Sequence, residues 1–211
     1  WGLDYPLLED WGMIQVPHKK YLNDYFTGRW DGSVSRGELY NEDLVTGDAR
    51  FCATTASMCG VEKAGFEQDE TAMSAAIQMD VMLHAYMLFL SGIPMLYSGD
   101  EIGQVNDYTY KEDPNKAPDS RYLHRGKFQW ELVENIDKPE TVQSRLFHSL
   151  AKLEELRAAE KVFDASANFR TLETWDDAIL GLVRENKDGK LIGLFNFSDE
   201  SRIAWIDEKD G

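Results

Sequence analysis

The stretch Gly92-Ile93-Pro94-Met95-Leu96-Tyr97-Ser98-Gly99-Asp100-Glu101 carries most of the information about the fold. Its apolar run, residues 93–97, has almost no polar alternation, which is typical of a strand buried on both faces of a parallel sheet. A long polar segment follows, from Ser98 to about residue 138. A buried strand that leads into a polar loop indicates an α/β fold in which functional loops follow the strand ends.

The residues before this stretch predict the clearest helix of the chain, residues 69–91. Asp69 is a suitable N-cap and Gly92 a suitable stop signal. The helix is apolar nearly all round, which favours burial inside a large fold. Gln78, Asp80 and His84 interrupt it, so we interpret it as a core helix rather than a membrane span. We expect His84 to be a core histidine whose ring is hydrogen-bonded.

Further elements follow on both sides. Pro17 to Phe26 predicts a short helix, and the glycine-rich residues 27–50 predict loops within an irregular segment, residues 1–68. Residues 139–161 predict an amphipathic helix opened by Pro139. Two apolar runs, 178–183 and 191–197, flank a turn at 186–189 and predict a β-hairpin, and residues 203–206 suggest another strand. We therefore divide the chain into residues 1–68, 69–164 and 165–211.

Composition narrows the range of partners. The chain has 211 residues, a formal net charge of -16 and a pI near 4.6. Such acidity disfavours nucleic acid and anionic membranes. The two cysteines, Cys52 and Cys59, lie among small residues and are interpreted as reduced core thiols, so a cytoplasmic location is expected. No phosphate-binding loop or zinc spacing is visible, and no cofactor or metal is predicted.

Residues 92–101 resemble the eighth barrel strand of the α-amylase superfamily, glycoside hydrolase family 13. Within it the segments 21–37, 46–50, 99–107 and 115–125 are most similar to amylosucrases. The resemblance implies the C-terminal part of a (β/α)8 barrel. Residues 1–68 would be a lid-like excursion after strand seven, residues 69–164 the end of the barrel, and residues 165–211 part of a β-domain.

The same resemblance implies a role for two arginines. Arg121, in Asp119-Ser120-Arg121, would form a salt bridge with an upstream aspartate at the floor of the glucosyl pocket. Arg50, in Gly47-Asp48-Ala49-Arg50, would contact the fructosyl unit. Asp100 and Glu101 are interpreted as structural, since neighbouring residues that leave a strand point to opposite sides. The family's catalytic carboxylates belong to motifs absent from this sequence, so no catalytic residue is predicted.

Three functions remain open at this point. The chain can be a fragment of a retaining enzyme acting on sucrose or another α-glucoside, inactive without the remainder of its barrel. It can belong to an α-glucosidase or a trehalose-forming isomerase of the same superfamily. It can also be a non-catalytic sugar-binding module. Four aromatic residues, Trp1, Tyr5, Trp11 and Trp30, are possible sugar-stacking residues, although core packing is the commoner role.

Overall fold

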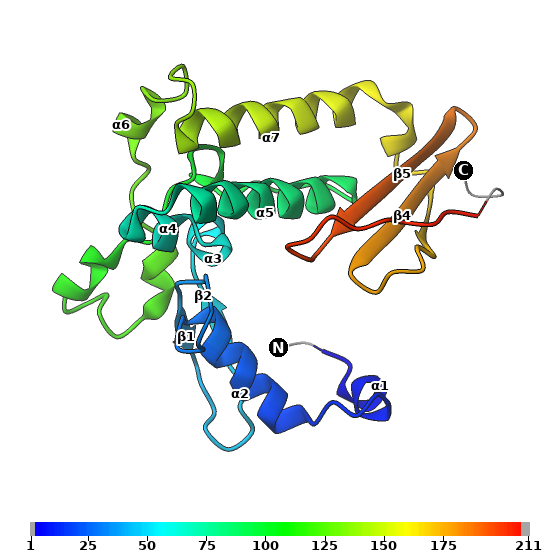
Figure 1. Ribbon diagram of the computed structural model, residues 1–211. Coiled ribbons are helices and arrows are strands. Elements are labelled where there is room, and N and C mark those ends of the chain that lie inside the picture. The colour runs from blue at the N-terminus through cyan, green and yellow to red at the C-terminus, as the bar shows by residue number, and fades with distance from the viewer. Residues whose placement is uncertain (1–2, 208–211) are drawn as a thin grey trace.

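The computed structural model describes residues 3–207, and two long helices form its centre. Helices α5 (Glu70–Phe89) and α7 (Val142–Ala159) lie side by side, with the shorter helices α3 (Thr55–Cys59) and α4 (Val61–Glu67) against the N-terminal half of α5 (Figure 1). Ile77 of α5 and Leu146 of α7 meet in a buried cluster with Ala56, Val61 and Ala76. Apolar burial between the helices is therefore the main source of stability in this region.

The ends of the two long helices follow from their capping residues. The Asp69 carboxylate accepts hydrogen bonds from the backbone N–H groups of Thr71 and Ala72, both at 2.9 Å, which confirms the predicted start of α5. The start predicted for α7 at Pro139 is wrong. The Thr141 hydroxyl accepts from the Ser144 N–H at 3.1 Å, so the side-chain cap, not the proline, sets the first turn.

The predicted hairpin is confirmed and lies at the C-terminal ends of α5 and α7 (Figure 1). Strands β4 (Ile179–Asn186) and β5 (Gly189–Asn196) pair antiparallel, and β3 (Asn168–Leu172), a strand not predicted from the sequence, pairs with the other edge of β4. Phe89 of α5 packs against Leu182 and Phe195 of this sheet. The strand suggested at residues 203–206 is absent, because Trp205 makes a single backbone hydrogen bond, to Thr174, instead of a ladder.

The N-terminal segment is more ordered than the predicted irregular excursion. It contains α1 (Tyr5–Asp10), α2 (Gln15–Phe26) and a two-stranded antiparallel sheet of β1 (Glu38–Tyr40) and β2 (Arg50–Cys52). The predicted helix at residues 17–26 is confirmed as α2. The sheet was missed because each strand is three residues long, too short to show a period. Cys52 and Cys59 are free and buried, as expected.

The segment after α5 differs from its prediction. Residues 93–97 form no strand, and Ile93 and Met95 are 89% and 80% exposed. A parallel strand is stabilised by hydrogen bonds to neighbouring strands, and none of the described residues supplies such a neighbour. The polar segment beyond it forms short helices: η1 (Asp100–Ile102), η2 (Tyr108–Glu112), η3 (Ser120–His124) and α6 (Trp130–Val133), with η4 (Lys161–Phe163) following α7.

Helix α5 is the single helix within residues 3–207 that is long and apolar enough to cross a membrane by length and composition. The core helix of a water-soluble protein passes the same test. In α5 the ionisable side chains Asp80 and His84 are buried against neighbouring elements of the chain.

Candidate active-site elements

Helix η3 packs against the β1–β2 sheet and brings the two arginines predicted from the sequence to one place. The Ser120 hydroxyl of η3 donates a hydrogen bond to the Leu39 carbonyl of β1 at 2.9 Å. In the ladder, Tyr40 of β1 lies opposite Arg50 of β2. Residues directly opposite in an antiparallel pair project to the same face of a sheet. Arg50 therefore projects to the same face of the sheet as Tyr40, the residue whose ring Arg121 contacts.

Arg121 is held by a two-point interaction with Asp119. Its Nε lies 2.8 Å from Asp119 Oδ1, and its Nη2 lies 2.7 Å from Oδ2. Asp119 is also the N-cap of η3, since its Oδ1 accepts from the Arg121 backbone N–H at 3.0 Å. The hydrogen bonds from Arg121 lower the pKa of the Asp119 carboxyl to about 2. The pair therefore stays ionised at neutral pH, and the plane of the guanidinium is fixed.

Tyr40 completes this arrangement, because the Arg121 guanidinium carbon lies 4.5 Å from the centre of the Tyr40 ring. Arg50 is exposed and has no ion pair with any of residues 3–207. Guanidinium groups bind carboxylates, phosphates and paired hydroxyls through two parallel hydrogen bonds. The arrangement can thus hold a polar ligand against an aromatic ring. It supplies no group that would break a glycosidic bond.

A second cluster of polar side chains lies inside the fold, where Asp100, from residues 92–101, contacts helix α5. His84 Nδ1 is hydrogen-bonded to the Asp80 backbone carbonyl at 3.0 Å and lies 2.9 Å from Asp80 Oδ1, while its Nε2 lies 3.4 Å from Asp100 Oδ2. Burial by itself would lower the pKa of His84, but its hydrogen bonds to Asp100 and Asp80 raise it to about 10. An imidazolium between two carboxylates therefore fixes the turn at Asp100 to α5. This confirms His84 as a hydrogen-bonded core histidine.

The turn at residues 99–101 is also closed by its own side chains. Asp100 Oδ2 accepts from the Tyr97 N–H at 3.1 Å, and Glu101 Oε2 accepts from the Gly99 N–H at 2.9 Å. Both carboxylates are therefore engaged in holding the turn. This geometry agrees with the structural interpretation given to Asp100 and Glu101.

Asn106 connects this turn to the N-terminal segment. Its side-chain oxygen accepts from the Thr54 N–H at 2.9 Å, and its Nδ2 donates to the Arg36 carbonyl at 3.0 Å. Its backbone N–H donates to the Ser57 hydroxyl at 2.9 Å. One buried asparagine therefore joins the polar segment after residue 98 to the residues next to β1 and β2. The two arginines and the Asp100 turn belong to one connected unit.

The structure gives different outcomes for the aromatic candidates. Tyr5 is buried, and its hydroxyl is hydrogen-bonded to His18 Nδ1 at 3.1 Å, so it has a packing role. Trp11 and Trp30 are exposed, while Trp1 lies outside the described residues. Tyr40, which contacts Arg121, was missed because a lone tyrosine in a glycine-rich stretch gives no signal. Asp119 as the partner of Arg121 was recognisable from the pattern Asp-x-Arg at a helix start.

Two further observations bear on the kind of site. No group of three or more potential metal ligands occurs within residues 3–207. A groove of about 980 Å³ lies away from the arginines, where it is lined by Pro94 and Leu96, by the end of α7 and by the β4–β5 turn. It contains neither Arg50 nor Arg121, so this groove and the predicted site do not coincide.

Comparison with known proteins relates the chain to carbohydrate chemistry. It is 31% identical over 120 residues to the glucosylglycerate phosphorylase of Escherichia coli (strain K12). The match covers 56% of this chain and 21% of that protein, so the matched region spans about a fifth of the relative's length. No family model matches the sequence. The chain is therefore, over part of its length, a distant homologue of a glycoside-processing enzyme.

Proposed function

We propose that the chain is the C-terminal part of an enzyme that transfers or hydrolyses the glucosyl unit of an α-glucoside. The observation that carries the proposal is the Arg50–Tyr40–Arg121 arrangement, joined through Asn106 to the turn at Asp100. The similarity to a glycoside-processing enzyme supports the same chemistry. In this proposal, the fragment supplies substrate-binding groups, while the carboxylates that break the bond belong to the remainder of the enzyme.

The proposed fold is the end of a (β/α)8 barrel followed by a β-domain. Residues 93–97 are the feature that supports it. Their exposure alternates: Ile93, Met95 and Tyr97 are exposed, while Pro94 and Leu96 are half-buried and line the groove of about 980 Å³. Alternation with a period of two is the pattern of an extended strand. In the complete enzyme, neighbouring strands would pair with this segment and cover its apolar side chains.

The acceptor of the glucosyl unit divides the proposal into two versions. Water or a sugar as acceptor gives a hydrolase or transferase acting on sucrose or a similar α-glucoside, including the α-glucosidase and isomerase alternatives. Inorganic phosphate as acceptor gives a phosphorylase, a version favoured by the name of the relative, glucosylglycerate phosphorylase. Arg50 also favours an anion, because its charge is not neutralised by any described residue. Partners and a cytoplasmic location remain part of the proposal.

A donor survey on the complete enzyme tests the proposal. Sucrose, maltose and glucosylglycerate would each be incubated with and without inorganic phosphate, and glucose and glucose phosphate would be measured. Release of glucosyl from any of the three donors is the expected result, and phosphate-dependent release identifies the phosphorylase version. Inactivity toward all three donors contradicts the proposal. The 211-residue chain alone is expected to be inactive, because it lacks the family's catalytic motifs. Turnover by the chain alone would contradict the proposal that the carboxylates that break the bond belong to the remainder of the enzyme.

A further inference from the structure

A buried lysine of α2 holds the segment that leads into Arg50. Lys19 is 6% exposed, and its Nζ lies 2.6 Å from Asp48 Oδ1. Asn23, one turn further along the helix, is also buried and donates from Nδ2 to the Gly47 carbonyl at 3.0 Å. Residues four apart in a helix lie on the same face. One face of α2 therefore holds two consecutive residues just before β2 begins.

The contact between α2 and the loop that connects β1 to β2 is close as well as polar. Gly47 has a φ of 73°, in the left-handed region that favours glycine. A Cβ atom at this position would lie 3.2 Å from Lys19 Cβ and 3.4 Å from the Val16 carbonyl oxygen. The loop is also closed on itself, since the Asp43 N–H donates to the Asp48 carbonyl at 2.7 Å. The segment before β2 is therefore fixed relative to α2.

The buried ammonium of Lys19 fixes a position more than it adds stability. Removal of a charge from water is unfavourable, and a buried ion pair contributes little net stability compared with apolar packing. The pair does restrict the arrangement of the chain, because a buried charge without its partner carries a large free-energy penalty. The hydrogen bond from Lys19 also lowers the pKa of the Asp48 carboxyl, so that carboxyl is ionised at neutral pH. These features indicate a role in positioning.

Arg50 is the residue whose position this contact sets. It follows Asp48 by two residues and lies opposite Tyr40 in the β1–β2 ladder. A displacement of the segment before β2 would therefore move Arg50 relative to Tyr40. Arg121, the other arginine of the arrangement, is held separately by Asp119 and by the Tyr40 ring. Helix α2 thus restrains Arg50 in the way that η3 restrains Arg121.

We propose that Lys19 is a positioning residue for Arg50, and that through Asp48 it sets how Arg50 meets the acceptor of the glucosyl unit. The inference rests on the proposed function, which gives Arg50 its ligand. Lys19 itself does not contact the acceptor, since its ammonium is buried between Asp48 and the Tyr5 ring, whose centre lies 5.0 Å away. Loss of the ion pair should therefore weaken acceptor binding without changing the chemical step.

A double-substitution cycle in the complete enzyme tests the proposal. The acceptor is inorganic phosphate or, if phosphate does not change the rate, fructose. We expect K19M to raise the KM for the acceptor about fivefold and to change kcat by less than about twofold, because uniform binding is lost and the chemical step is not. In an R50A background, K19M should have no further effect on this KM. An unchanged KM in K19M overturns the proposal, and so does an equal effect of K19M with and without Arg50.

Substitutions on the loop side of the contact approach it without altering α2. D48N removes the charge and is expected to raise the acceptor KM as K19M does. D48E keeps a carboxylate at a residue whose side chain is half exposed, and it should stay within about twofold of the unsubstituted enzyme. G47A leaves both charges in place but brings a Cβ against α2, so it should also raise this KM. A normal KM in both D48N and G47A overturns the proposal.

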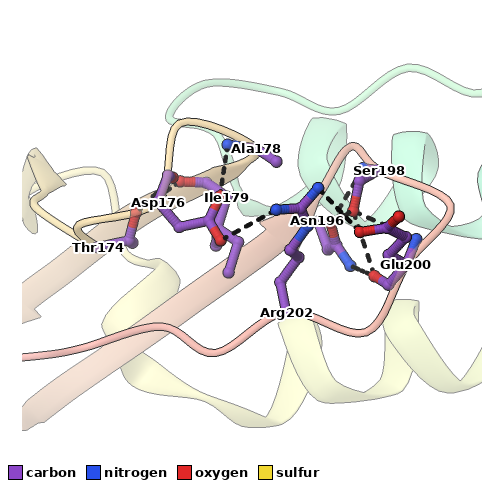
Figure 2. Close-up of polar contacts among 8 residues, drawn as sticks. All are labelled: Thr174, Asp176, Ala178, Ile179, Asn196, Ser198, Glu200 and Arg202. Carbon is purple, nitrogen blue, oxygen red and sulfur yellow. Dashed lines mark hydrogen bonds and ion pairs between the residues drawn. The ribbon is translucent and has the colours of Figure 1, made fainter.

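Two cations elsewhere in the chain supply controls. K20M removes the exposed neighbour of Lys19 on α2. R202M removes ion pairs that join two segments of the C-terminal sheet, since the Arg202 guanidinium lies 3.2 Å from Glu200 and 3.9 Å from Asp176 (Figure 2). Neither substitution should change the acceptor KM by more than about twofold. A rise in KM with R202M equal to that with K19M overturns the proposal, because any lost ion pair would then have the same effect.

Hydrogen exchange separates this proposal from the proposed function, because it needs no turnover. In the 211-residue chain, amide exchange over residues 47–52 should be at least about fivefold faster in K19M than in the unsubstituted chain, with exchange in α5 unchanged, since local opening follows the loss of local contacts. Mass spectrometry measures both regions. Unchanged exchange over residues 47–52 in K19M overturns the proposal. A complete enzyme that is inactive on every donor contradicts the proposed function, while faster exchange in K19M would still support the positioning of Arg50 by Lys19.

Discussion

The Arg121 guanidinium carbon lies 4.5 Å from the centre of the Tyr40 ring, while Asp119 holds two of its nitrogens. A guanidinium that is hydrogen-bonded to a carboxylate along one edge and packed against an aromatic ring on one face has little freedom to rotate. The free N–H groups of Arg121 therefore point in a direction set by η3 and β1. This relationship is what the proposed sugar contact depends on.

Replacement of Arg121 by lysine keeps the charge but removes the planar two-point contact with Asp119. In the complete enzyme we expect kcat/KM for the preferred donor to fall by about 100-fold, which corresponds to about 2.7 kcal/mol of lost transition-state stabilisation. Steady-state kinetics measure the change. The matched control is R125K at an exposed arginine four residues further on, which should change kcat/KM by less than about twofold. Equal effects of the two substitutions would contradict a role for Arg121 in the site.

Arg50 separates the two versions of the proposed function. We expect R50A to raise the KM for the anionic or sugar acceptor by about tenfold, equivalent to about 1.4 kcal/mol, with a smaller change in the KM for the donor. If phosphate is the acceptor, the effect of R50A should be smaller at high salt, where the electrostatic attraction that Arg50 contributes is screened. The control is R29A, since Arg29 is exposed but already paired with Asp24 at 2.9 Å. An unchanged acceptor KM in R50A would remove Arg50 from the site.

The interaction of His84 with Asp80 and Asp100 predicts how stability depends on pH. The folded-state pKa of His84, about 10, lies above its ordinary value of 6.5. The stabilisation from protonated His84 is therefore complete below about pH 6.5, and it is lost as the pH rises through about 10. We expect H84Q to lower the free energy of unfolding at pH 6 by about 3–5 kcal/mol, because it leaves two buried carboxylates without their cation.

Urea unfolding at pH 6, 8 and 10 measures this effect. The difference between the unsubstituted chain and H84Q should shrink steadily across the series. H148Q, at an exposed histidine of α7, is the control and should show no such trend. A difference that stays constant from pH 6 to pH 10 would show that His84 does not carry the charge assigned to it.

Exposed apolar residues on the 93–97 segment predict association of the isolated chain. We expect the double substitution I93T/M95T to reduce self-association of the 211-residue chain, since it removes two large apolar side chains that are accessible to a second molecule. Sedimentation velocity over a concentration series measures the change. In the complete enzyme the same substitutions should destabilise the fold, because the proposed barrel buries both side chains.

The control for that experiment is L44T/V45T, at two equally exposed apolar residues in the loop between β1 and β2. This pair should leave the stability of the complete enzyme unchanged. If I93T/M95T left the stability of the complete enzyme unchanged, residues 93–97 would not be a buried barrel strand.

Arg184 anchors the C-terminal sheet to the end of α5 without any carboxylate partner among the described residues. The residue is 1% exposed, and its guanidinium donates to the Val162 carbonyl at 3.1 Å, the Phe89 carbonyl at 3.2 Å and the Ser91 hydroxyl at 3.1 Å. We expect R184M to destabilise the chain by about 2–4 kcal/mol, because methionine fills part of the space but leaves buried carbonyls without a donor. Thermal and urea unfolding measure the loss. K152M on the exposed face of α7 is the control and should lie within about 0.5 kcal/mol of the unsubstituted chain.

The sequence by itself determined the elements whose signals are local. Asp69 marked the start of α5, the alternating runs around residues 186–189 marked the β4–β5 hairpin, and His84 was recognised as a core histidine. Capping, turn chemistry and burial act over a few residues, so they leave a readable pattern. The resemblance also singled out Arg50 and Arg121, although it assigned Arg121 to a partner upstream of this chain.

Only the tertiary structure decided which residues meet. Arg121 of η3 packs on the Tyr40 ring of β1, Tyr40 lies opposite Arg50 in the ladder, and Asn106 joins segments about 70 residues apart in the chain. Residues 93–97 also depend on distant parts of the fold. Their apolar run predicted a strand, but such a run forms a strand only where neighbouring strands complete its hydrogen bonds. Long-range contacts are made by side chains that carry no local signal, and that is why the pattern of a sequence cannot specify them.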